Sequence, residues 1–321
     1  MIRPLRFGVI GCGRIATRSM IPALLASESA ELVAVASRSA EKAAETARTF
    51  GCEGVAGYEN LLSRGDLDAV YVALPIGLHS KWTLAAAHAG LHVLCEKSLA
   101  GTLAECEQMI AAADEAGVAL LEAFAYRFHP NHARVAETIA SGVIGDPVQV
   151  RTCFGFPPLN SAHRYDVGLG GGALNDAGAY CVHASRMVFG AEPRAISATL
   201  DVGDQPVDIH GAALFDFGQG RSAVLGFGFN NMYRNTYEVW GTEGVLSLTR
   251  AFSNPPTLSA SMVVTRQDGV QEHSLPPADH FLCQVDAFCA GAGEAATQQS
   301  WREEALGQAR AMERVRAGSM G

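Results

Sequence analysis

The chain has 321 residues, of which 48% are hydrophobic and 18% are charged, so it is long enough for about two domains with ordinary buried cores. Its formal net charge of −9 argues against generic binding to nucleic acid or to an anionic membrane, because both depend on clustered Lys and Arg. The eight cysteines lack zinc spacing, and the chain has neither a signal-peptide pattern nor an apolar run that could cross a bilayer, so we expect a soluble cytoplasmic protein without a metal site.

The first 126 residues alternate strand-like and helix-like segments. The strand-like segments are almost continuously apolar, which is typical of a parallel sheet covered by helices on both faces. They comprise residues 6–11, 31–37, 68–75, 92–97 and 118–124. Capping residues bound three predicted helices. These helices run from Ser39 to Gly51, from Ser80 to Gly90, and from a Thr102–Glu105 capping box to Gly117. The pattern predicts a doubly wound Rossmann domain over residues 1–126.

The pattern changes in the remaining residues, 127–321. A helix is predicted over residues 173–189, followed by several strands joined by the turn-like sequences FGQGR and WGTEG. We expect a second, largely antiparallel α+β domain. Two late helical stretches, around residues 281–288 and 301–315, either cover this sheet or return to the first domain.

A glycine-rich turn directly follows the first strand. Gly11 permits a tight turn, Gly13 lets the backbone approach a pyrophosphate, and the small Ala16 allows close helix packing. Pro22 lacks an N–H, so the helix must kink there or restart near Ser19. The turn predicts a dinucleotide site at a helix N-terminus; a purely structural turn is the alternative.

The second strand ends in Ser37 and Arg38, where an NAD enzyme normally has an acidic residue for the ribose hydroxyls. A guanidinium beside a hydroxyl suits the 2′-phosphate of NADP(H) by charge and by donor geometry. We therefore expect NADP(H) to be preferred, with NAD(H) possible. The alternative is that Arg38 is only a solvated residue at a helix start.

Three more segments, residues 74–79, 95–98 and 122–130, follow strand ends, where open α/β sheets bind ligands. Together with the sequence GGGALNDAGAY at residues 170–180, their order and spacing resemble the glucose-fructose oxidoreductase, inositol dehydrogenase and rhizopine-catabolism family. The resemblance covers essentially the whole chain. It implies a second domain with a large open sheet, an active site between the two domains, and small-molecule substrates such as sugars and cyclitols. It also implies a homodimer or homotetramer that assembles through the open sheet.

The resemblance assigns candidate residues. The family's Glu-Lys-Pro motif corresponds to Glu96, Lys97 and Ser98, with the lysine near the nicotinamide and the substrate oxygen. Because proline would fix the backbone after the lysine, Ser98 leaves the placement of Lys97 open. The expected cofactor contacts are Gly11, Gly13, Arg14, Ile15, Ser37, Arg38, Leu74, Pro75, His79, Glu96, Lys97 and Arg127.

Asp176 and Tyr180 replace the Asp and His that end the second-domain motif in many members of the family. Their spacing is about one helical turn, so both can project from one face. A tyrosine here is similar to the sugar-nucleotide 3-ketoreductases of deoxysugar biosynthesis, and also to xylose and trans-dihydrodiol dehydrogenases. Residues 165–167, 235–238 and 252–256 favour the first group. The expected substrate contacts are Lys97, Tyr165, Asp176, Tyr180 and Tyr237.

These residue types suit carbonyl reduction. A carbonyl oxygen that gains negative charge needs a proton, which Tyr180 or Lys97 could donate, while Lys97 stabilises the oxyanion and Asp176 orients Lys97 or a substrate hydroxyl. We expect NADPH-dependent reduction of a keto group, at C3, on a nucleotide-linked deoxysugar. One alternative is an NADP-dependent dehydrogenase of a free sugar or trans-dihydrodiol; another is a cofactor-binding regulatory protein. For Tyr180 itself, a packing role in the core is the competing interpretation.

Overall fold

The computed structural model describes residues 3–158 and 161–318. The chain forms two compact units: residues 1–125 with 281–306, and residues 126–280 with 307–321. This division differs from the predicted ranges 1–126 and 127–321, because the segment 281–306 packs with the first unit. The helix α9, Ala295–Gly318, accordingly contributes residues to both units.

The first unit is built on a six-stranded sheet in the order β3-β2-β1-β4-β5-β6, and all of its strand pairs are parallel. The strands are β1 Leu5–Ile10, β2 Ala30–Ser37, β3 Glu53–Ala56, β4 Ala69–Val72, β5 His92–Glu96 and β6 Leu120–Ala123. The strand order reverses between β1 and β4, which is where such sheets bind ligands. The predicted Rossmann sheet is confirmed, although the sequence analysis missed β3, a short edge strand with no buried residue.

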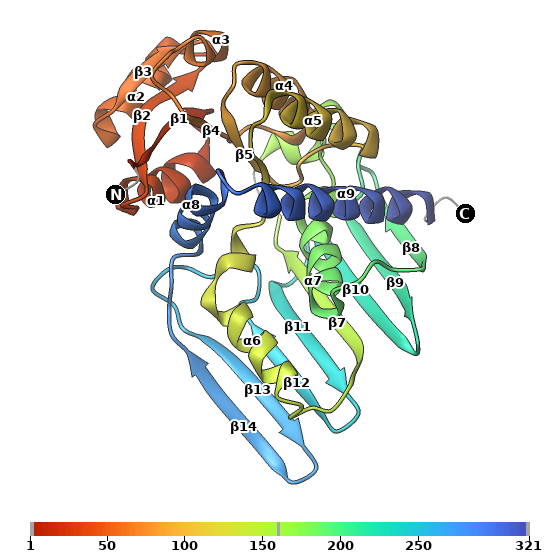
Figure 1. The fold of residues 1–321 in the computed structure, drawn as a ribbon. Helices are drawn as coiled ribbons and strands as arrows, with labels where there is room; N and C mark the ends of the chain where they lie inside the picture. Colours follow the sequence, from red (N-terminus) through yellow and green to blue (C-terminus); the bar gives the residue numbers. More distant parts are fainter. Residues whose placement is uncertain (1–2, 159–160, 319–321) are drawn as a thin grey trace. The chain divides into compact units, whose positions relative to one another are not determined.

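Helices flank this sheet (Figure 1). They are the π-helix η1 Ala16–Met20, α1 Ile21–Ala26, α2 Ala40–Phe50, α3 Tyr58–Leu62, the short 3₁₀ helix η2 Ile76–Leu78, α4 His79–His88, α5 Leu103–Ala116, and α8 His280–Gly291. Ser39 caps α2, and Thr102 and Glu105 form the predicted capping box of α5. The predicted cap at Ser80 is wrong: α4 already begins at His79, and its N-cap Leu78 has no side-chain bond.

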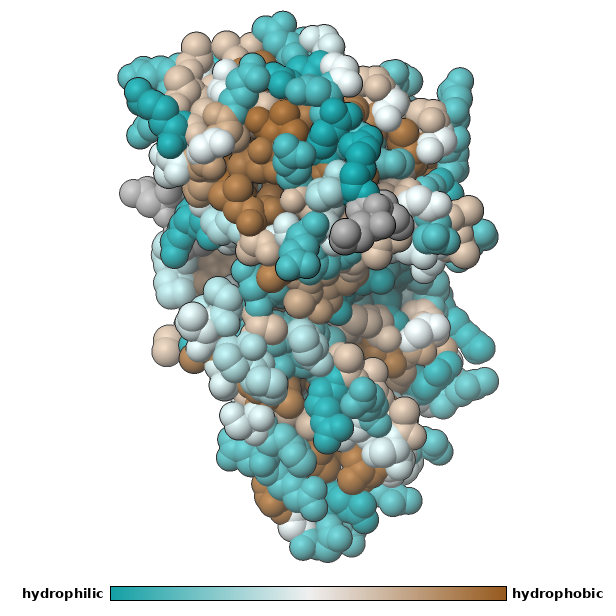
Figure 2. Space-filling view, turned by 60° about the vertical axis from the view of Figure 1, so that its left-hand side comes forward, coloured by the Kyte–Doolittle hydropathy of each residue, from teal (hydrophilic) through white to brown (hydrophobic). Residues whose placement is uncertain are grey.

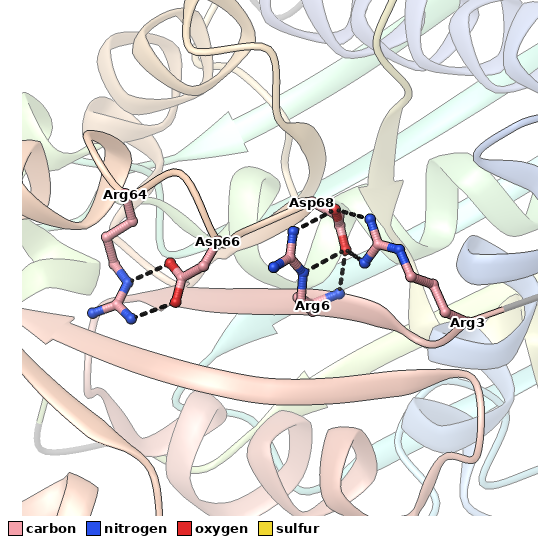
Figure 3. A network of polar contacts seen from close by, with 5 residues as sticks. All are labelled: Arg3, Arg6, Arg64, Asp66 and Asp68. Atoms are coloured by element: carbon pink, nitrogen blue, oxygen red, sulfur yellow. Dashed lines mark hydrogen bonds and ion pairs between the residues drawn. The ribbon is translucent and has the colours of Figure 1, made fainter.

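An ion-pair network ties the N-terminal ends of β1 and β4 together (Figure 3). Asp68, just before β4, accepts hydrogen bonds from Arg3 Nη1 at 2.7 Å and Arg6 Nε at 3.2 Å, while Arg64 pairs with Asp66 at 2.7 Å. Burial alone would raise the pKa of Asp68, but the bonds from Arg3 and Arg6 outweigh it and hold this pKa well below its usual range. The network lies at the N-terminal ends of these central strands, opposite the C-terminal strand ends at which such sheets bind ligands.

The second unit contains an eight-stranded sheet in the order β14-β13-β12-β11-β7-β10-β9-β8. The strands are β7 Pro147–Phe156, β8 Ala195–Asp201, β9 His210–Gly218, β10 Arg221–Phe229, β11 Arg234–Gly241, β12 Gly244–Thr249, β13 Ala260–Arg266 and β14 Gly269–Leu275. Within the described residues, β7 and β10 are the one parallel pair and the other neighbours are antiparallel. The predicted large, mostly antiparallel open sheet is confirmed.

The two faces of this sheet differ. The helices α6 Pro130–Ala140 and α7 Ala179–Phe189 lie over one face (Figure 1), where alternate side chains such as Phe215 and Leu225 are buried. On the other face, Leu214, Val224 and Trp240 are 52%, 41% and 46% exposed. Leu214 and Val224 are direct cross-strand neighbours.

Elsewhere the visible surface mixes hydrophilic side chains with separate hydrophobic areas (Figure 2). Among the described helices, none combines the length and apolar character needed to cross a membrane.

Candidate active site

The glycine turn after β1 has the geometry that a dinucleotide requires. Gly11 has φ +105°, and a Cβ there would lie 2.6 Å from the Ala73 carbonyl oxygen, so only glycine fits. At Gly13 a Cβ would have no neighbour closer than 3.9 Å, which leaves an open side on the backbone. Arg14 and Ile15 are exposed at the start of the helix, and Ala16 is buried. These residues fit a pyrophosphate held by the free N–H groups of a helix start.

The helix after this turn runs through Pro22 without restarting near Ser19, and its hydrogen-bond pattern changes just before the proline. The chain forms the π-helix η1 up to Met20 and then continues as α1, in which Pro22 occupies the first turn. Directly before the proline, the Ile21 N–H donates to the Ala16 carbonyl oxygen in the π-helical pattern, and Pro22 itself has no N–H to donate.

The end of β2 presents a basic group. Arg38 is exposed, and Ser37 is 7% exposed with its hydroxyl accepting a hydrogen bond from the Ser39 backbone N–H at 3.2 Å. Burial raises the pKa of the Tyr58 phenol, and the positive charge of the neighbouring Arg38 partly offsets this. Sequence reasoning missed Tyr58, because its approach to Arg38 depends on how α3 packs beside β2.

The loop after β4 is fixed by His79. This histidine is fully buried; its Nδ1 lies 2.9 Å from the Ser98 carbonyl oxygen and its Nε2 lies 2.7 Å from the Leu74 carbonyl oxygen. Burial lowers the pKa of the imidazole. His79 was expected beside the nicotinamide; in the structure its ring bridges two backbone segments of the predicted site. Leu74 and Pro75 are partly exposed on the same loop.

The segment after β5 carries the candidate lysine. Tyr71 of β4 donates a short hydrogen bond to the Glu96 carboxylate, and the Leu99 N–H donates to Glu122 Oε1 at 2.8 Å. Lys97 lies between these anchors and is partly exposed, and the peptide bond that joins it to Ser98 is cis. The structure thus holds the backbone on both sides of Lys97 although the family's proline is absent.

In the second unit, Asp176 and Tyr180 lie on consecutive helical segments. Asp176 belongs to the π-helix η6 Leu174–Gly178, and Tyr180 to the first turn of α7. The start of η6 is fixed by Asp208, whose carboxylate accepts a hydrogen bond from the Leu174 N–H at 2.6 Å. The Asp176 carboxylate forms a close ion pair with Arg164 Nε. This pairing was not predicted from the sequence.

Tyr180 is partly exposed, and its ring is held by three other rings of the same unit. The ring centroids of Phe154, Phe252 and Tyr126 lie 5.2, 5.6 and 5.7 Å from that of Tyr180. Behind them, the Tyr126 hydroxyl lies 2.5 Å from His183 Nδ1. The surrounding rings fix the orientation of the Tyr180 ring, and the side chain remains partly exposed.

The remaining candidates differ in exposure. Tyr165 is partly exposed, with its ring centroid 5.7 Å from that of Phe229. Tyr237 is 1% exposed and its hydroxyl lies 3.0 Å from His132 Nδ1, so the structure places it in the core rather than on an open pocket wall. Arg127 is partly exposed and belongs to the second unit, with its guanidinium 5.0 Å from the centre of the Phe128 ring.

A depression of about 340 Å³ lies on the second sheet. Its lining includes Cys153, Ala212 and Gly226 but none of the predicted site residues. We therefore do not assign it to the reaction. Within residues 3–158 and 161–318 there is also no group of three His, Cys, Asp or Glu side chains that could hold a metal ion.

The fold and these residues define an oxidoreductase with a dinucleotide-binding Rossmann domain. Residues 5–124 match the model of an oxidoreductase family with an NAD-binding Rossmann fold, and residues 132–247 match the model of the GFO/IDH/MocA C-terminal domain. The chain belongs to the Gfo/Idh/MocA family of oxidoreductases.

Several relatives match nearly the whole chain. The dTDP-3,4-didehydro-2,6-dideoxy-alpha-D-glucose 3-reductase of Actinomadura kijaniata is 39% identical over 98% of this chain and 96% of its own. The D-xylose 1-dehydrogenase (NADP(+)) 2 of Haloferax volcanii is 36% identical over 96% of this chain and 95% of its own.

Solved structures of similar proteins also match nearly the whole chain. The crystal structure of an A. kijaniata 3-ketoreductase with NADP and TDP-benzene has a TM-score of 0.94 at 39% identity and covers 98% of both chains. Variants of that enzyme with a lysine replaced by alanine, or a tyrosine by phenylalanine, have also been solved with both ligands.

Proposed function

We propose that this protein is an NADPH-dependent ketoreductase that reduces a keto group, at C3, of a nucleotide-linked deoxysugar. The observation that carries the proposal is the full-length similarity to dTDP-sugar 3-reductases in a chain that has both Lys97 and Tyr180. The class of reaction follows from the family, and the substrate follows from these relatives.

The preference for NADPH is supported by the end of β2. Arg38 offers an exposed guanidinium and Ser37 a neighbouring hydroxyl, where an acidic residue would repel a 2′-phosphate. The glycine turn at Gly11 and Gly13 would hold the pyrophosphate. The bound nicotinamide would supply the hydride for the carbonyl carbon.

The chain's own residues would handle the charge on the carbonyl oxygen. The Lys97 ammonium stabilises the negative charge that develops there. Tyr180 donates the proton, since a phenol with a fixed ring direction presents its O–H in one direction. Asp176, which is paired with Arg164, would accept a hydrogen bond from a sugar hydroxyl. Lys97 is the alternative proton donor. Site-directed variants distinguish it from Tyr180.

Site-directed variants test these roles. With a nucleotide-linked 3-keto sugar, Tyr180→Phe is expected to lower kcat about 100-fold or more, because the positioned acid is lost. Lys97→Ala is expected to lower kcat similarly, by removing an oxyanion-stabilising charge. The affinity for NADPH should change little in Tyr180→Phe.

Matched controls are available in the same units. Lys81 and Tyr233 are exposed residues outside the proposed site, so Lys81→Ala and Tyr233→Phe should keep kcat within about twofold. Full activity of Tyr180→Phe would assign the proton to Lys97. Full activity of both site variants would contradict the mechanism.

A second candidate function is an NADP-dependent dehydrogenase of a free sugar or trans-dihydrodiol. It is favoured by the relative from H. volcanii and by the trans-1,2-dihydrobenzene-1,2-diol dehydrogenase of Xenopus laevis, which is 30% identical over 82% of this chain. Oxidation of xylose or a dihydrodiol with NADP, together with no turnover of nucleotide keto-sugars, would select this function.

Our proposal includes a homodimer or homotetramer assembled through the open face of the second sheet. The cross-strand neighbours Leu214 and Val224 support it, since adjacent exposed apolar side chains gain from being covered, and Trp240 is a further exposed apolar side chain of that face. Val224→Arg should then reduce the mass measured by light scattering.

Our proposal also includes a cytoplasmic location. The use of NADPH and the free cysteines agree with it.

A further inference from the structure

We infer that Glu122 is a positioning residue for Lys97: it holds the peptide group that follows Ser98 and so fixes the backbone from which the lysine side chain projects. This inference rests on the proposed role of Lys97 in the reaction. Its geometry lies entirely within the first unit.

The Ser98–Leu99 peptide group is bound at both ends. Its N–H donates to Glu122 Oε1 at 2.8 Å, and its carbonyl oxygen lies 2.9 Å from His79 Nδ1. Ser98 and Leu99 are 4% and 3% exposed, so water does not compete freely for these contacts. Rotation of this peptide group would break the bond from the Leu99 N–H to Glu122, and also the bond to the Ser98 carbonyl oxygen in the tautomer that carries the proton on His79 Nδ1.

Glu122 occupies a place from which it can act on this segment. It lies on β6 opposite Cys95 of β5, and it is 7% exposed. Since β5 ends at Glu96, the chain leaves the sheet at Lys97 and passes the Glu122 carboxylate at Leu99. Burial of a carboxylate is costly unless it accepts hydrogen bonds, and a bond to a backbone N–H is charge-assisted.

The other end of the segment is held independently. Tyr71 of β4 donates to the Glu96 carboxylate. Lys97 therefore lies between one anchor on β4 and another on β6. A proline at position 98 would restrict the φ torsion, and Ser98 does not. Here the backbone is restricted instead by the contacts of the Ser98–Leu99 peptide group with Glu122 and His79.

Three substitutions at position 122 separate positioning from charge. Glu122→Leu cannot accept the Leu99 N–H, and Glu122→Asp keeps the charge but is shorter by one methylene. Both should lower kcat about 10- to 100-fold, because a misplacement of about 1 Å can cost that much. Glu122→Gln still offers an amide oxygen and should restore kcat to within about threefold. The KM for NADPH should stay within about threefold in all of them.

A double-mutant cycle shows whether Glu122 acts through Lys97. In a Lys97→Ala background, Glu122→Leu should change kcat by less than about threefold, because no lysine remains to be positioned. Glu105→Leu is the matched control: Glu105 also accepts backbone N–H bonds, but at the start of α5. Any effect of this control should be equal in both backgrounds. An equal effect of Glu122→Leu in both backgrounds would overturn the inference.

A chemical readout separates this inference from the proposed function. The rate at which an amine-reactive acylating reagent labels Lys97, measured by mass spectrometry relative to Lys81, should change at least about threefold in Glu122→Asp and recover in Glu122→Gln. An unchanged rate would overturn the positioning role even if Lys97 proves essential. A changed rate with a fully active Lys97→Ala enzyme would instead leave the positioning role standing and refute the catalytic role of Lys97.

Discussion

The roles of single residues could be predicted where they depend only on neighbouring residues in the sequence. Gly11 could be recognised because a tight turn after a strand needs a positive φ, and the structure has this conformation. The bonds of Glu122 to the Leu99 N–H and of Arg164 to Asp176 could not be predicted, because each joins residues that are far apart in the sequence. Tyr237 was placed at the substrate by resemblance, yet its side chain is buried.

The cofactor preference rests on one residue, Arg38. Replacing it by Asp should raise the Kd for NADPH by about 30-fold or more, since a charge-assisted contact becomes a repulsion. The Kd for NADH should change by less than about threefold. Fluorescence titration with both cofactors measures this, with Arg48→Asp on the exposed side of α2 as the control. Equal losses for the two cofactors would remove the assignment.

Elements were predicted from their caps and apolar runs, and this worked where the signal lay within the element. The α5 capping box is an example: Thr102 and Glu105 bond each other's backbone as predicted. It failed for Ser80, because η2 runs directly into α4 and no separate cap is needed. It also failed for β3, whose edge position removes the apolar run.

The capping box gives a stability prediction. Thr102→Ala should lower the free energy of unfolding by about 1 kcal/mol, because the Glu105 N–H loses its acceptor. Thr102→Ser keeps a hydroxyl acceptor and should retain most of the stability that the cap contributes. Thermal unfolding measures the difference, and identical melting temperatures for Thr102→Ala and the wild type would contradict the role of this cap.

The β1–β4 network gives a pH dependence. The pKa of Asp68 lies below its unfolded value, so its stabilising contribution is present above that unfolded value, about 4, and is lost as the pH falls towards the folded pKa. Asp68→Asn should therefore destabilise the protein at pH 7, and the gap from the wild type should narrow below about pH 4. Denaturant unfolding across this range checks it; a gap that is independent of pH would refute the ionic contribution.

At the scale of the whole molecule, the first sheet was predicted from continuous apolar runs that alternate with capped helices, and the second from several strands joined by turn-like sequences. The placement of residues 281–306 stayed open, since an amphipathic helix does not specify which apolar surface it covers. In the structure this segment belongs to the first unit: Phe288 is fully buried, with its ring 5.8 Å from both Phe7 and Trp301.

The most direct test follows the hydride itself. The enzyme is incubated with dTDP-3,4-didehydro-2,6-dideoxy-alpha-D-glucose and NADPH that carries deuterium at the transferred position, and the product is analysed by NMR. Our account predicts stoichiometric consumption of NADPH and deuterium on C3 of the sugar. Deuterium at another carbon would contradict the assignment of C3. No consumption of NADPH with this substrate, under conditions in which free xylose is oxidised with NADP, would contradict the proposed function.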